Sequence, residues 1–165
     1  MTAIMGYGNE LMEDDWIGLF IVESLKESAL FPWEIIHGGT PGFNVLWDLL
    51  GREKLIIIDS VLSENTPGKI FKLSSQELLD NINMNGLNYS SSHGINWQEV
   101  IAIGMSQYPD LFPKEITFLL IEIVSVNLAY KTFSPAIDSC KHSIAKKIEQ
   151  EILQILKGQQ EICRN

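Results

Sequence analysis

The fold is decided by the stretch Gly6-Tyr7-Gly8-Asn9-Glu10-Leu11-Met12-Glu13-Asp14-Asp15-Trp16-Ile17-Gly18. Apolar residues 3–5 run into its two glycines and asparagine, residue types that let a strand turn sharply. We therefore expect a first strand to end here. From Ile17 onward apolar side chains recur at helical spacing, which predicts a helix that begins near Asp14 or Asp15.

A strand, a glycine turn and a helix start together suggest a phosphate cradle, but the charges disfavour one. A dinucleotide fingerprint needs a third glycine where this chain has Leu11. Glu10, Glu13, Asp14 and Asp15 would also place negative charge beside the bound anion. A cation is the better ligand for this turn.

The two adjacent aspartates also fit a helix start, because an Asp N-cap and an acidic first turn suit the helix dipole. Asp14 is the expected N-cap, and its replacement by Ala should then cost about 1 kcal/mol of stability. Capping does not explain the Gly-x-Gly-Asn sequence that precedes the aspartates.

Composition indicates one domain spanning residues 1–165, with 45% hydrophobic and 20% charged residues, as in ordinary folded domains. The net charge of −9 disfavours nucleic-acid and anionic-membrane partners, because proteins bind both through clustered Lys and Arg. Cys140 and Cys163 have no metal-binding spacing and are expected to stay reduced. With no signal peptide or membrane span recognisable, we expect a cytoplasmic monomer.

The rest of the chain alternates strand-like and helix-like segments, which predicts an α/β sheet sandwiched between helices. The run 68–73 is expected to be an edge strand, with antiparallel pairing left open. The other expected strands are 33–37, 54–59 and 116–121; the expected helices cover 43–50 and 75–79 and begin at Asn96 and at Ser134-Pro135.

Candidate chemistry collects where these strands end, because loops at the carboxyl ends of parallel strands form the binding crevice. Asp15, His37 and Asp59 each follow a different expected strand, and His93 precedes a helix in a polar loop. Carboxylates and an imidazole suit Zn, Mn, Ni or Fe with open positions. A lone histidine is more often a surface or hydrogen-bonded residue than a ligand, so both interpretations of His93 stay open at this point.

The opening stretch resembles that of the hydrogenase maturation proteases, nickel-dependent endopeptidases that trim the carboxyl tail of the [NiFe]-hydrogenase large subunit. Their pattern, Gly-x-Gly-Asn-x-Leu-x-x-Asp-(Asp or Glu)-x-x-Gly, is matched at every fixed position between Gly6 and Gly18. The similarity spans nearly the whole chain. It implies a single α/β domain with a five-stranded, twisted, mostly parallel sheet between helices.

The resemblance also implies the site residues. Asp15, Asp59 at the close of the third strand, and His93 in a Ser-x-His segment match the family's metal ligands, and they would also be the catalytic residues. The family recognises nickel already loaded in the large-subunit precursor, so the metal reports completed assembly. We therefore expect nickel to arrive with the substrate, and other divalent metals to occupy the site in vitro.

Two segments depart from the family pattern. His37-Gly38-Gly39-Thr40 stands where the family usually has Asp-Gly-Gly-Thr, so His37 is either an extra ligand or a strand-end residue without a site role. Residues 120–123 keep only part of a Gly-Ile-(Glu or Gln)-Pro segment. The prediction is a nickel-checkpoint endopeptidase acting on a hydrogenase large-subunit precursor; the alternative is a non-catalytic metal- or partner-binding module on the same fold.

Overall fold

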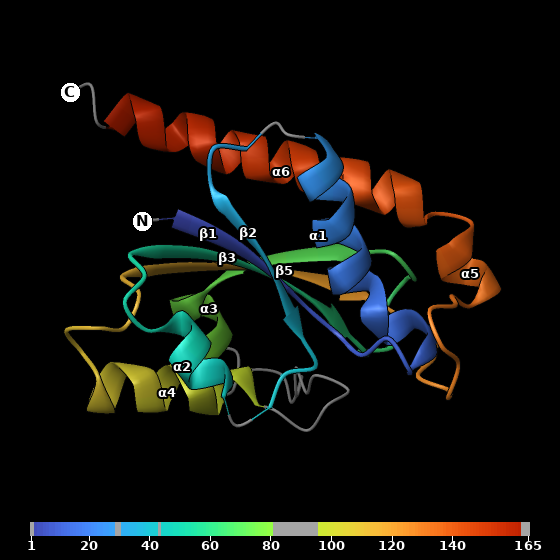
Figure 1. The fold of residues 1–165 in the computed structure, drawn as a ribbon, viewed down its shortest axis with the longest axis horizontal. Coiled ribbons are helices and arrows are strands. Elements are labelled where there is room, and N and C mark those ends of the chain that lie inside the picture. Colours follow the sequence, from blue (N-terminus) through green and yellow to red (C-terminus); the bar gives the residue numbers. More distant parts are fainter. Residues whose placement is uncertain (1, 29–30, 43, 81–95, 163–165) are drawn as a thin grey trace.

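The computed structural model describes residues 2–28, 31–42, 44–80 and 96–162, with the backbone alone for 159–162. A twisted five-stranded sheet lies between two layers of helices (Figure 1). The predicted α/β class and the strand number implied by the family resemblance are both confirmed.

The sheet has the order β2-β1-β3-β5-β4. The first four of these strands are parallel, and β4 pairs with β5 in the antiparallel sense at one edge. The edge strand expected near 68–73 is therefore present. The strands are β1 (Thr2–Tyr7), β2 (Glu34–Gly39), β3 (Lys54–Val61), β4 (Ile70–Ser74) and β5 (Glu115–Glu122).

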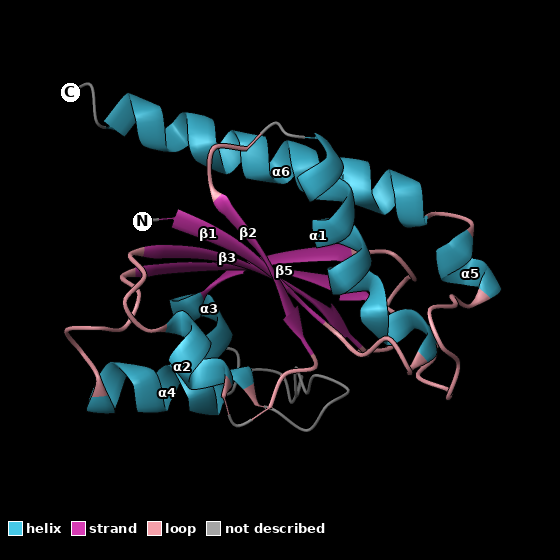
Figure 2. Cartoon of the chain, in the orientation of Figure 1, coloured by secondary structure: helices cyan, strands magenta, loops and turns pink. Residues whose placement is uncertain are grey.

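Helices cover both faces of the sheet, with α1 and α6 on one side and α2, α3 and α4 on the other (Figures 1 and 2). They are α1 (Ile17–Ser28), preceded by the 3-10 turn η1 (Glu13–Trp16), then α2 (Val45–Leu49), α3 (Ser75–Asp80), α4 (Trp97–Gln107), α5 (Pro135–Asp138) and α6 (Lys141–Ile162). Among the described residues, no helix combines the length and the apolar character needed to cross a membrane.

The central strand β3 explains why its sequence is apolar without alternation. Side chains on a strand point alternately to the two faces of the sheet. Leu55 and Ile57 pack under α2 and α4, whereas Ile56 and Ile58 pack under α1 and α6. Burial on both faces therefore requires an apolar residue at each of these positions.

The glycines of the opening stretch let η1 and α1 lie directly against the sheet. A Cβ added at Gly18 would lie 2.2 Å from the Tyr7 carbonyl oxygen and 2.7 Å from that of Ile58. One added at Gly8 would lie 2.2 Å from the Asp15 carbonyl oxygen. Only residues without a side chain allow this approach, so the motif fixes where Asp15 lies.

Two helix boundaries differ from the sequence expectation. The α-helix begins at Ile17, after η1. Asp14, the expected N-cap of this helix, lies inside η1, and the N-cap of η1 is Met12, which makes no side-chain cap. The expected single last helix is divided into α5 and α6. Cys140 N–H bonds to the Ile137 carbonyl three residues back, which interrupts the α-helical hydrogen-bond ladder.

Candidate functional site

Asp15 is fully buried in η1, at the carboxyl end of β1. Its Oδ2 accepts a hydrogen bond from the Asn9 backbone N–H at 3.1 Å, and its Oδ1 accepts one from the Ser60 hydroxyl at 2.6 Å. The turn that follows the two glycines therefore holds one carboxylate oxygen, and β3 holds the other.

Asp59 is also fully buried, but it lies inside β3, which continues to Val61. Its Oδ1 accepts from the Ser60 backbone N–H at 2.8 Å, and its Oδ2 accepts from Trp97 Nε1 at 2.9 Å. Trp97 is the first residue of α4 and packs edge-on against Tyr7 and Phe118. The indole thus orients the Asp59 carboxylate from the α4 side of the sheet.

Ser60 connects the two carboxylates, since its hydroxyl donates to Asp15 and its backbone N–H donates to Asp59. The pairing of β1 with β3 ends at Gly6 and Ile58, so the next residues of β3 have no partner residue on β1. Asp15 contacts Ser60 just beyond the end of this pairing. The structure therefore brings two of the sequence-predicted site residues to one place at the carboxyl edge of the sheet.

Asp14 is fully buried beside Asp15 but has a different role. Its Oδ2 accepts from the backbone N–H groups of Val124 and Ser125 and from the Ser134 hydroxyl, at 3.2, 3.1 and 2.8 Å. Its Oδ1 accepts from Ser134 N–H at 2.7 Å. Asp14 thus fastens η1 to the segment after β5 and to the N-cap of α5.

Glu122, in the partly matched segment 120–123, is fully buried at the end of β5. Its carboxylate accepts from Ser63 N–H at 2.8 Å, from Asn65 N–H at 3.1 Å and from the Ser63 hydroxyl. These bonds organise the turn that follows β3. Glu122 is therefore a further buried carboxylate that shapes this edge of the sheet.

Burial sets the electrostatics of Tyr7, which lies beside this site. Desolvation raises the pKa of the Tyr7 hydroxyl strongly, and the negative charges of Asp48 and Asp59 raise it further. The hydroxyl contacts Met5 Sδ at 4.0 Å. Tyr7 consequently stays neutral across the physiological pH range and adds no charge to the site.

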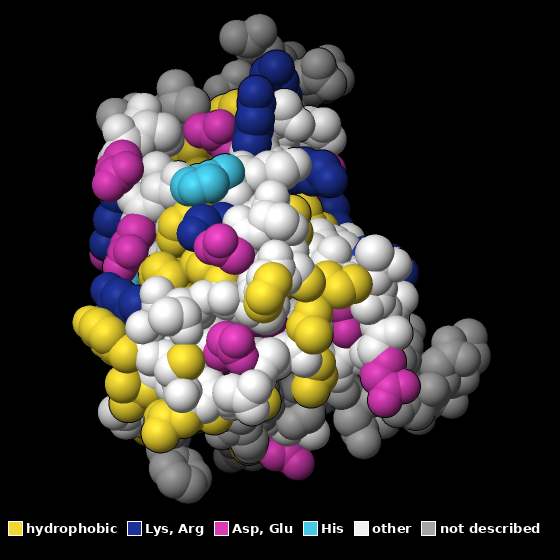
Figure 3. All heavy atoms as spheres, turned by 90° about the vertical axis from the view of Figure 1, so that its right-hand side faces the viewer, with side chains coloured by type: hydrophobic (Ala, Val, Ile, Leu, Met, Phe, Trp, Pro, Cys, Tyr) yellow, Lys and Arg dark blue, Asp and Glu magenta, His cyan; other side chains and the backbone are white. Residues whose placement is uncertain are grey.

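The end of the molecule that carries the two carboxylates also exposes apolar side chains (Figure 3). Leu11, Leu62, Val124, Leu128 and Tyr130 follow strands β1, β3 or β5 in the chain and are between 48% and 82% exposed. Ala129 N–H bonds to the Leu11 carbonyl at 2.9 Å, which brings the segment after β5 alongside the one after β1. We call these five residues the apolar rim.

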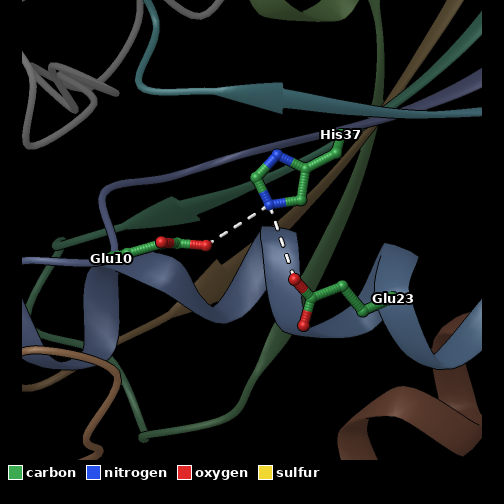
Figure 4. A group of neighbouring side chains, drawn as sticks. All are labelled: Glu10, Glu23 and His37. Atoms are coloured by element: carbon green, nitrogen blue, oxygen red, sulfur yellow. Dashed lines mark ion pairs between the residues drawn. The ribbon is translucent and has the colours of Figure 1, made fainter.

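The structure does not bring His37 to Asp59. His37 is in register with Gly6, and Gly6 with Ile58, so the His37 side chain lies on the α1 face of the sheet. Asp59, one residue after Ile58, points to the other face. His37 Nε2 instead faces Glu10 and Glu23, at 3.5 and 3.6 Å (Figure 4).

His93, the third ligand expected from the family resemblance, lies outside the described residues, in the segment 81–95 that precedes α4. The sequence places this segment directly before Asn96, whose side chain caps α4 by accepting from Gln98 N–H at 3.0 Å. His93 therefore stays a prediction.

The described part of the site can hold a divalent ion by its chemistry. Asp15 and Asp59 supply carboxylate oxygens, the ligand type that suits hard and borderline divalent metals. Both are held by hydrogen bonds from N–H and O–H donors, the outer partners that orient metal-binding carboxylates. The donor set therefore fits a divalent ion.

Sequence reasoning missed Ser60 and the indole of Trp97 as parts of this site. The signal for Ser60 was its polar side chain directly after Asp59 in an otherwise apolar strand. Trp97 was counted only as an apolar residue of its helix, although a buried indole N–H needs an acceptor. That need pointed to a nearby carboxylate.

Comparisons with known proteins point to one family. The family model for HycI, hydrogenase maturation protease, matches residues 19–151. The hydrogenase 2 maturation protease of Escherichia coli K12 is 33% identical over 119 residues, which cover 70% of this chain and 69% of that protein. HupD of Rhodobacter capsulatus, a hydrogenase expression/formation protein, is 27% identical over 138 residues, which cover 82% of this chain and 63% of its own length.

Solved structures show the same relationship. The hydrogenase maturating endopeptidase HybD from E. coli superposes with a TM-score of 0.72 at 26% identity, covering 93% of this chain and 92% of that one. The [NiFe] hydrogenase maturation protease HybD from Thermococcus kodakarensis gives 0.69 at 25% identity, covering 90% and 97%. The family model covers well over half of the sequence. This chain belongs to the hydrogenase maturation protease family.

Proposed function

We propose that this protein is an endopeptidase that removes the C-terminal tail of a nickel-loaded [NiFe]-hydrogenase large-subunit precursor, using the nickel of the substrate as its recognition checkpoint. The observation that carries the proposal is the pair of buried carboxylates, Asp15 and Asp59, joined through Ser60. The family to which the chain belongs supports the protease activity.

In this proposal the precursor brings the ion, and Asp15, Asp59 and His93 bind it. A metal beside the scissile peptide can polarise its carbonyl or a water molecule. The chain's own contribution is orientation, because Ser60, Asn9 and Trp97 hold the two carboxylates before substrate arrives. Such preorganisation lowers the entropic cost of placing the reacting groups.

The apolar rim supports a protein as the substrate. Several large apolar side chains exposed at one end of a domain are a feature of surfaces that bind another macromolecule. This rim lies on loops that directly follow the strands bearing the site, so a precursor seated on it would have its tail near Asp15 and Asp59. We therefore propose that the apolar rim binds the folded part of the precursor.

The proposal is tested by cleavage of nickel-loaded precursor with the wild type, Asp15→Asn and His93→Ala. Loss of cleavage at both positions, with the folded structure retained, is expected because each substitution removes a proposed ligand atom. Asp110→Asn and His142→Ala, two exposed positions, are the matched controls and should cleave normally. Normal cleavage by Asp15→Asn would refute the proposal. A wild type that binds precursor without cleaving it would favour the non-catalytic module.

A further inference from the structure

A second group of potential ligands shares no residue with the Asp15–Asp59 site. Glu10 comes from the turn after β1, Glu23 from α1 and His37 from the edge strand β2. Their side chains converge on one point, and their candidate ligand atoms all lie within 4.8 Å of one another (Figure 4). Three separate elements thus supply an imidazole nitrogen and two carboxylate oxygens to one place.

The spacing of these atoms fits metal coordination better than hydrogen bonding. His37 Nε2 lies 3.5 Å from Glu10 Oε1 and 3.6 Å from Glu23 Oε1. A hydrogen bond from an imidazole N–H would be about 2.9 Å long. Two ligands bound to zinc at about 2.1 Å and at the tetrahedral angle are about 3.4 Å apart. The two distances from His37 are therefore close to the edges of a tetrahedral site, and the two carboxylate oxygens lie within 4.8 Å of each other.

We propose that Glu10, Glu23 and His37 form a divalent-cation site of the zinc type, separate from the Asp15–Asp59 site. One neutral imidazole and two carboxylates are a ligand set that zinc accepts, with a fourth position left for water or another donor. The side chains are 30–43% exposed, so an ion can reach them from solvent.

Lys131 shares the two carboxylates. Its Nζ lies 3.1 Å from Glu10 Oε1 and 3.9 Å from Glu23 Oε1, the same oxygens that face His37. Two carboxylates and one ammonium leave a net charge of −1 when His37 is neutral. A divalent ion would therefore compete with Lys131, and removing the ammonium should strengthen metal binding.

The site would form part of the wall of a pocket. Glu10 and His37 both line a cavity of about 280 Å³ at the ends of β1 and β2, together with Gly8, Asn9 and Thr40. An ion bound by His37 would hold the turn after β1 against β2. None of the site's three ligands is Asp15, Asp59 or His93, so metal binding here can be measured without any cleavage assay.

The test must resolve the two sites, because Asp15 and Asp59 can also bind zinc. Zn²⁺ is titrated into the full chain while the imidazole NMR signals of its three histidines are followed. The expected result is a saturable shift of the His37 signals in the wild type and in Asp15→Asn. A His37 signal that does not move with Zn²⁺ would overturn the proposal.

Variants at the carboxylates and at Lys131 give a second measurement. Glu23→Gln should weaken Zn²⁺ binding at His37 at least tenfold, since loss of outer-shell partners alone costs 10–100-fold. Glu27→Gln, an exposed position on the same helix, is the matched control and should bind normally. Lys131→Met should tighten binding. Unchanged affinity in Glu23→Gln or in Lys131→Met would contradict the ligand set or the competition.

Discussion

Asp14 and Asp15 are adjacent, equally buried aspartates, yet their replacement by Asn should affect stability very differently. Both oxygens of Asp14 accept from backbone N–H groups, those of Val124 and Ser125 on one side and that of Ser134 on the other. A backbone N–H can donate a hydrogen bond but cannot accept one. In either orientation of the side chain introduced by Asp14→Asn, the NH₂ group therefore faces a backbone N–H instead of an acceptor.

The cost follows from the groups left without a partner. In the better orientation of the introduced amide the Ser134 N–H is unpaired and buried, which costs about 1–3 kcal/mol. The remaining bonds lose their charge assistance, about 1 kcal/mol each. We expect Asp14→Asn to lower the free energy of unfolding by about 4–6 kcal/mol, which for a domain of this size lowers Tm by at least about 8 °C.

Asp15→Asn should behave differently because one of its partners is a hydroxyl. The Ser60 hydroxyl can rotate and accept from the new NH₂ group, while the amide oxygen still accepts from Asn9 N–H. We expect a smaller loss, about 2 kcal/mol, from the lost charge assistance of these two bonds. Urea denaturation of both variants measures the contrast. Equal destabilisation of the two, or a stable Asp14→Asn, would refute the assignment of Asp14 as the residue that fastens the loops.

Three further predictions concern the surroundings of the site. Trp97→Phe keeps an aromatic ring but removes the N–H donor to Asp59, so precursor cleavage should fall about tenfold, and the lost bond and the smaller ring should lower the free energy of unfolding by about 1–3 kcal/mol. Gly18→Ala places a Cβ 2.2 Å from a backbone oxygen and should cost about 3 kcal/mol in urea denaturation, whereas Gly158→Ala, with open space around it, should not destabilise. Burial raises the pKa of Tyr7 above its ordinary value of 10.0, so the folded state holds this proton more tightly than the unfolded chain. The free energy of unfolding should therefore fall as the pH rises above 10.0, and Tyr7→Phe, measured over the same pH series, should fall less steeply.

The sheet was predictable from sequence because burial on both faces leaves a local pattern. The apolar runs 54–59 and 116–121 correspond to β3 and β5, the two strands with the most extensive pairing. Helix ends were less predictable. The break before α6 depends on backbone hydrogen bonding around Cys140, for which the sequence carries no Gly or Pro signal.

The different roles of Asp14, which fastens η1 to later loops, and Asp15, which belongs to the proposed site, could not be predicted from neighbouring residues. Asp14 is bonded to Val124 and Ser134, which are 110 and 120 residues away in the chain. The direction of His37 was likewise decided by strand register, since a shift of one residue would have moved its side chain to the other face of the sheet. Such contacts depend on tertiary packing, and a single sequence does not reveal them.

The most direct test of the proposed checkpoint is cleavage of one precursor in three forms: metal-free, zinc-treated and nickel-loaded. Two carboxylates and one imidazole bind several divalent ions, and the general affinity order does not favour nickel over copper. Selectivity must then come from nickel held in the precursor itself. We predict cleavage of the nickel-loaded form alone, with weak nickel binding by the isolated enzyme in calorimetry. Efficient cleavage of the metal-free precursor would contradict the nickel checkpoint.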